Sequence, residues 1–143
     1  FEARSAEMAE RILAALGPTP EGKRVGVLGV TFKPETDDMR DAPSLVILPR
    51  LVAAGLQVRA FDPQPGHARQ ALPAGVDFAQ TAMGAIEGAD ALVVLTEWNE
   101  FRALPAARLK AAMKGDVVLD LRNVWDPAAM RAAGFVYSSI GRP

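Results

Sequence analysis

Two short, uninterrupted apolar runs constrain the fold more than any other feature of this 143-residue chain. Residues 25–30 read Val-Gly-Val-Leu-Gly-Val, and residues 91–95 read Ala-Leu-Val-Val-Leu. Apolar runs of this length, without alternating polar residues, are typical of strands that are buried on both faces, as in parallel sheets. Both runs fall far short of the roughly 20 residues that a membrane span needs.

Segments with helical spacing alternate with further strands along the chain. We expect helices over residues 1–16, 42–54, 81–88, 105–113 and 127–133, and further strands over 57–62, 76–78, 117–121 and 135–137. Thr81 is expected to cap the third helix, and Pro49 to kink or interrupt the second. This alternation predicts an α/β fold: a Rossmann-like, doubly wound, mainly parallel sheet of about six strands, flanked by helices and preceded by an N-terminal helix.

Composition excludes several classes of function. The 16 basic and 17 acidic side chains nearly balance, whereas nucleic-acid binding requires a strongly basic face, so we expect neither a nucleic-acid nor a membrane partner. The chain has no cysteine and one histidine, which excludes disulfides, thiolate zinc sites and multi-histidine metal sites within it. The lack of cysteine and of a signal peptide fits a cytoplasmic protein.

Basic residues follow two of the predicted strands. Lys33 and Arg40 lie on the loop after the first strand and before a helix, and Arg122 follows the fifth strand. Ligands of doubly wound sheets bind at the carboxyl ends of the strands, and helix N-termini favour anions. An anion site formed by Lys33 and Arg40 and suited to phosphates is therefore one interpretation of this loop, and a solvated loop whose charges pair with one another is the other.

A complete NAD site is not predicted for this chain. Gly26 and Gly29 resemble parts of the G-x-G-x-x-G fingerprint, but Leu28 and Thr31 stand where that fingerprint has its next glycines. Without those glycines a pyrophosphate cannot approach the backbone in the usual way.

Several ordered motifs carry a resemblance to one family. Residues 29–43 read G-V-T-F-K-P-E-T-D-D-M-R-D-A-P and resemble the G-x-x-F-K-P-x-T-D-D-x-R-[DE]-x-P signature of the nucleotide-sugar dehydrogenases. The segments at 58–63, 89–101, 120–124 and 137–142 resemble further motifs of that family, among them T-E-W-x-x-F and D-x-R-N. The resemblance covers nearly the whole chain.

This resemblance implies a place for the chain within a larger enzyme. Residues 1–17 would be the end of a central dimerisation helix, and residues 18–143 the nucleotide-sugar (UDP)-binding domain. The full-length protein would be a homodimer that oxidises UDP-glucose to UDP-glucuronate in two NAD-dependent steps. Its catalytic cysteine and most of its NAD site would lie upstream, so this chain alone is expected to be inactive. The alternatives are a domain acting on UDP-N-acetylmannosamine or GDP-mannose, and a non-enzymatic Rossmann-like binding module.

Site roles carry over from the family to single positions. By resemblance, Lys33 and Arg122 contact the UDP-sugar and Arg40 reaches toward NAD, while this chain supplies no catalytic residue and no metal ligand. Ala42 replaces the family's serine before Pro43, which leaves Asp41 or Ser44 to supply a helix-start hydrogen bond.

Three further polar or aromatic residues lie near the ends of predicted strands. We interpret Trp98 as a packing residue and Asp62 as a turn-forming residue. Glu97 either orients a cation or is a solvated or capping residue.

Overall fold

All six strands of the sheet run parallel, in the order β3-β2-β1-β4-β5-β6 of a doubly wound Rossmann fold. The computed structural model describes residues 2–19, 21–31, 42–64 and 68–139. The strands are β1 (Arg24–Leu28), β2 (Gln57–Phe61), β3 (Val76–Phe78), β4 (Ala91–Val94), β5 (Val117–Asp120) and β6 (Val136–Ser139). The helices are α1 (Glu2–Ala15), α2 (Ser44–Ala53), α3 (Ala68–Ala71), α4 (Ala82–Ile86), α5 (Asn99–Arg102), α6 (Ala106–Ala112) and α7 (Pro127–Ala132). The predicted fold class is confirmed.

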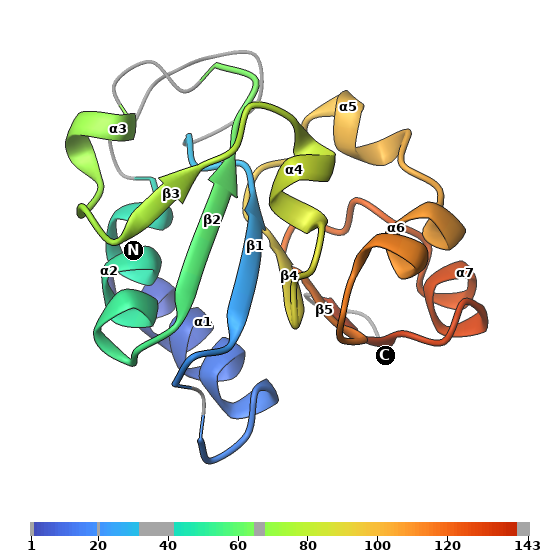
Figure 1. Ribbon diagram of the computed structural model, residues 1–143, viewed down its shortest axis with the longest axis horizontal. Coiled ribbons are helices and arrows are strands. Elements are labelled where there is room, and N and C mark those ends of the chain that lie inside the picture. Colours follow the sequence, from blue (N-terminus) through green and yellow to red (C-terminus); the bar gives the residue numbers. More distant parts are fainter. Residues whose placement is uncertain (1, 20, 32–41, 65–67, 140–143) are drawn as a thin grey trace.

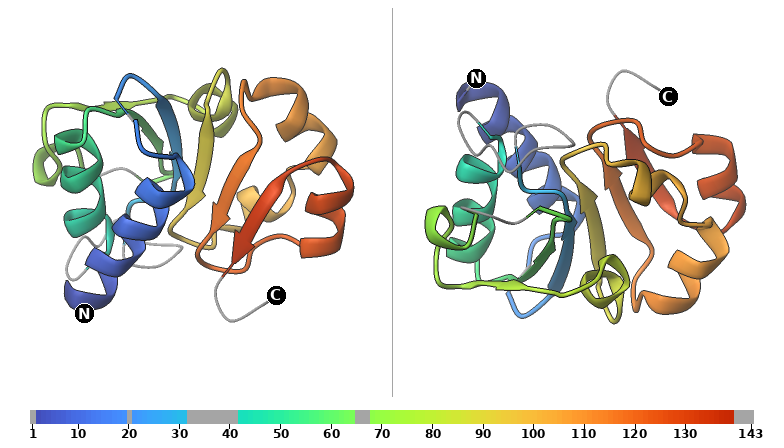
Figure 2. Two further views of the ribbon diagram at one scale, coloured as in Figure 1. Left: turned by 90° about the horizontal axis from the view of Figure 1, so that it is seen from below. Right: turned by 90° about the horizontal axis from the view of Figure 1, so that it is seen from above.

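Helices cover the sheet on both faces, with α1 and α2 on one side and α4, α6 and α7 on the other (Figures 1 and 2). Each layer buries its own apolar cluster, because successive side chains of a strand point to opposite faces. Val27 of β1 therefore packs in the cluster that includes Ile12 and Leu48, while Leu28 packs in the cluster that includes Ile86 and Phe101. A continuously apolar strand contributes side chains to both clusters, which is why the runs at 25–30 and 91–95 contain no charged side chains.

The expected elements are present, with ends that differ from the predicted ones by at most two residues. Thr81 caps α4 as predicted, since its side chain accepts a hydrogen bond of 3.0 Å from the amide of Gly84. Pro49, which we expected to kink or interrupt its helix, does not interrupt it. Helix α2 continues through Pro49 because Ile47, Leu48 and Leu51 are buried around it and hold the segment against the sheet.

Two short helices, α3 and α5, were not predicted. Each has four residues and forms about one turn, which is too short to produce a helical repeat in the sequence. Among the described residues, no helix has both the length and the apolar character required to cross a bilayer.

Candidate functional site

Polar side chains tie together the carboxyl ends of the central strands. Asp62, directly after β2, is buried and its Oδ2 accepts hydrogen bonds from the amides of Val30 (2.8 Å) and Thr31 (3.2 Å). Thr96, after β4, donates through Oγ1 to the carbonyl of Thr31 at 2.8 Å. Strand order reverses between β1 and β4, so Thr31 stands at the topological switch point where such folds bind ligands.

A buried carboxylate shapes the loop after β5. Asp120 is fully buried, and its Oδ1 accepts from the amides of Arg122 (3.3 Å) and Val124 (3.0 Å). Its Oδ2 accepts from the amide of Trp125 (2.8 Å) and from the hydroxyl of Tyr137 (2.5 Å). The loop therefore wraps around the carboxylate and leaves the side chain of Arg122 half-buried at the surface.

The side chain of Arg122 is held by Glu97, which follows the neighbouring strand β4. Nε donates to Oε2 at 2.7 Å and Nη2 donates to Oε1 at 3.0 Å. The two side chains are 33% and 25% exposed, respectively. A guanidinium has five N–H groups, and this side-on pair uses two of them. The other three N–H groups of Arg122 donate to no described residue of the chain and can serve an anion.

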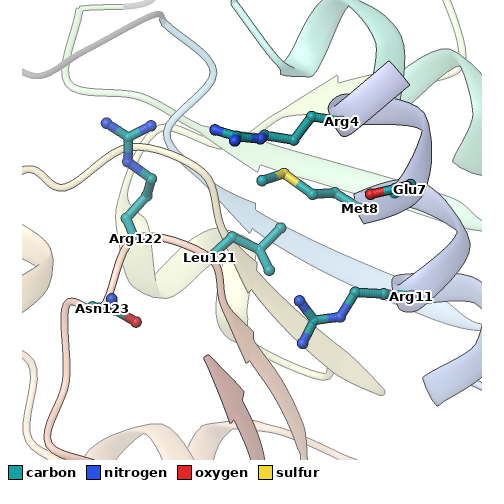
Figure 3. Close-up of a pocket in the computed structure, with 7 residues that line it drawn as sticks. All are labelled: Arg4, Glu7, Met8, Arg11, Leu121, Arg122 and Asn123. Carbon is teal, nitrogen blue, oxygen red and sulfur yellow. The ribbon is translucent and has the colours of Figure 1, made fainter. Parts of the chain in front are cut away.

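Arg122 also borders a pocket between α1 and the loop after β5 (Figure 3). The pocket has a volume of about 510 Å³, within the usual range for small-molecule sites. It is lined by Arg4, Glu7, Met8, Arg11, Leu121, Arg122 and Asn123. Among the described lining residues, three arginines outweigh one glutamate, and Met8 and Leu121 add apolar surface between the charges. The composition suits an organic anion.

The residues predicted for the site have different outcomes. Arg122 lies at the carboxyl edge of the sheet, whereas Lys33 and Arg40 lie outside the described residues, so their roles stay predictions. Glu97 orients a cation, the first of the two interpretations considered for it. Ser44 does not supply a helix-start bond, because its hydroxyl donates to the carbonyl of Val30 instead.

Two further interpretations are confirmed. Trp98 is a packing residue, 5% exposed in the core beside α5, and its Nε1 has no hydrogen-bond partner among the described residues. Asp62 forms the expected turn, since its Oδ1 accepts from the amide of Gln64 at 2.8 Å.

The two glycines near β1 serve packing within the chain. A Cβ at Gly26 would lie 2.4 Å from the carbonyl oxygen of Ala85, and one at Gly29 would lie 2.5 Å from Cβ of Thr96. The lack of a side chain at these two glycines therefore lets β1 and the residue that follows it approach α4 and the loop after β4 closely.

Comparison with known proteins identifies the family. Residues 26–127 match the model of the UDP-glucose/GDP-mannose dehydrogenase family, UDP binding domain. The chain belongs to this family. It is 44% identical over 140 residues to a UDP-glucose 6-dehydrogenase of Rhizobium meliloti and 40% identical over 152 residues to one of Pseudomonas aeruginosa. These alignments cover 98% and 99% of this chain but 32% and 34% of the relatives.

A solved member of the family has the same fold. The NDP-N-acetyl-D-galactosaminuronic acid dehydrogenase of Methanosarcina mazei superposes with a TM-score of 0.79 at 30% identity. The superposition covers 99% of this chain and 30% of that protein. This chain thus spans about a third of the length of the family members that it matches.

Sequence reasoning did not single out the residues that α1 contributes to the pocket. Arg4 and Arg11 lie one on each side of Met8 at helical spacing, a signal that can be read as one face of a helix. The pattern does not show that these arginines lie near the carboxyl end of β5, because this position depends on how α1 packs on the sheet.

Proposed function

We propose that this UDP binding domain serves an NAD-dependent UDP-glucose 6-dehydrogenase, which oxidises UDP-glucose to UDP-glucuronate in two steps. The observation that carries the proposal is the placement of Arg122, oriented by Glu97 at the carboxyl edge of the sheet beside a positive pocket. Relatives with this name at 40–44% identity support the choice of substrate.

In this proposal, the far edge of the Arg122 guanidinium binds the diphosphate of the nucleotide sugar. A planar guanidinium can donate two parallel hydrogen bonds to phosphate oxygens, and the pair with Glu97 holds it in one orientation beforehand. Lys33 would add a second positive charge. It follows Thr31 by two residues, and the strand that precedes Thr31 is separated from β5 by β4 alone. Two strand spacings amount to about 10 Å, so the long side chains of Lys33 and Arg122 could both contact one ligand bound between them.

NAD would be bound mainly by a part of the protein outside this chain. The incomplete glycine fingerprint at Gly26 and Gly29 supports this division, because a pyrophosphate approaches the backbone in the usual way only where all of its glycines are present. Arg40 is proposed to reach across to NAD, so that this chain contributes one contact to the cofactor. A homodimer and a cytoplasmic location belong to the same proposal, supported by the family resemblance and by the cysteine-free composition.

The test is turnover by the full-length protein that contains this chain. We expect NAD reduction with UDP-glucose to exceed that with UDP-N-acetylmannosamine, a UDP-N-acetylgalactosamine substrate or GDP-mannose. If the protein prefers another of these nucleotide sugars, that sugar and not UDP-glucose is the substrate. No turnover with any of them would favour a binding module, and turnover by the 143-residue chain alone would contradict the proposed division of labour.

The role of Arg122 is tested by Arg122→Ala in the same full-length protein. Loss of the charged hydrogen bonds to the diphosphate should cost about 1.5–3 kcal/mol, or roughly ten- to a hundredfold in affinity for UDP-glucose. Arg40→Ala should instead raise the KM for NAD. Titration with UDP-glucose that is unchanged in Arg122→Ala would remove this arginine from the site.

A further inference from the structure

The geometry points to Arg4 of helix α1 as a second phosphate-binding residue, which acts beside Arg122 on the same ligand. Arg4 and Arg122 line one pocket although they are far apart in the chain (Figure 3). This inference rests on the proposed function, because it adds a contact to the diphosphate site assigned to Arg122.

The direction of α1 places Arg4 at the correct end of the sheet. Leu16, just after α1, lies next to the start of β1, since Nζ of Lys23 donates to the carbonyl of Leu16 at 2.6 Å. The C-terminal end of α1 is therefore at the amino edge of the sheet, and the helix runs opposite to the strands. Its N-terminal turns, with Arg4, approach the carboxyl edge, where Arg122 follows β5.

The face that α1 presents to the pocket is set by how the helix is buried. Ser5, Ala9 and Ile12 are buried at helical spacing, and Ala9 and Ile12 belong to the apolar cluster on this face of the sheet. Arg4 and Arg11 lie next to this buried stripe, are exposed and, in Figure 3, extend from α1 toward the side of the pocket formed by Leu121 and Arg122. The guanidinium groups of Arg4 and Arg11 therefore lie at the border of the pocket.

Spacing along the helix separates the two arginines of α1. Arg4 and Arg11 are seven residues apart, which corresponds to about 10.5 Å along the axis. A diphosphate that binds Arg122 at the carboxyl edge is then within closer reach of Arg4 than of Arg11. Arg11 acts on it through the longer-range potential of the pocket, and Glu7, the one acid that the structure describes in the lining, opposes both arginines.

Four single variants of the full-length protein test this inference, with UDP and inorganic pyrophosphate as titrated ligands. Arg4→Gln should weaken the binding of both ligands about three- to fivefold, and Arg11→Gln less than twofold. Glu7→Gln should strengthen binding about twofold, a gain that a damaged fold cannot produce. Arg108→Gln, on exposed α6 across the sheet, makes the same change of net charge and should have no effect. All these effects should shrink as salt is raised.

The outcomes separate this inference from the proposed function. If Arg122→Ala weakens UDP binding and the α1 variants leave it unchanged, Arg4 is not a phosphate ligand and the proposed function stands. If pyrophosphate binding depends on Arg4 but UDP does not bind, Arg4 is a phosphate ligand as inferred and the proposed UDP-sugar substrate is wrong. Equal losses in Arg4→Gln and Arg108→Gln would reduce the effect to net charge and overturn the inference.

Discussion

Replacing Asp120 by asparagine should destabilise the domain by about 2–4 kcal/mol. The carboxylate accepts hydrogen bonds from three backbone amides and from the hydroxyl of Tyr137, two on each oxygen, whereas asparagine offers one acceptor oxygen and one NH2 group. The amide can keep the shorter bonds from Trp125 and Tyr137 and then points its NH2 at the amides of Arg122 and Val124. The buried amide of Val124 then has no acceptor, which costs about 1–3 kcal/mol. The bonds from Trp125 and Tyr137 lose their charged acceptor, which adds about 1 kcal/mol.

Urea unfolding of the 143-residue chain measures this effect. With a slope of about 2 kcal/mol per molar urea, the midpoint should fall by about 1–2 M and the slope should not change. Asp116→Asn is the matched control, because Asp116 is exposed at the start of the same strand and should shift the free energy of unfolding by less than about 0.5 kcal/mol. A loss below about 1 kcal/mol in Asp120→Asn would refute the view that this carboxylate organises the loop.

Two further pairs of variants test local features by the same unfolding measurement. Trp125→Phe should cost about 1–2 kcal/mol more than Trp98→Phe, since Nε1 of Trp125 donates to a buried carbonyl at 2.9 Å and Nε1 of Trp98 has no described partner. Equal losses would mean that the hydrogen bond contributes nothing. Gly29→Ala should lower the free energy of unfolding by about 2–4 kcal/mol, because Gly29 has a positive φ of 87° and the added Cβ would collide with Thr96. Gly17→Ala should lower it by about 1 kcal/mol, because Gly17 has a similar φ of 92° but open space around it. Similar values at both sites would contradict the close approach at Gly29.

The alternation of strands and helices could be predicted because each element leaves a local pattern. The apolar runs that became β1 and β4 need burial on both faces, and a parallel, doubly wound sheet is the arrangement that supplies it. Helices α3 and α5 escaped prediction because a single turn has no repeat to detect.

The sequence by itself determined the fold class and the family motifs and pointed to Arg122 as a candidate site residue, because these depend on residue type and on spacing along one segment. Only the tertiary structure decided what Arg122 meets. Its pairing with Glu97 depends on β4 and β5 being neighbours, and its proximity to Arg4 depends on α1 running opposite to the strands. Contacts between distant segments follow from strand order and helix packing, and neither is encoded in the local pattern of any one segment.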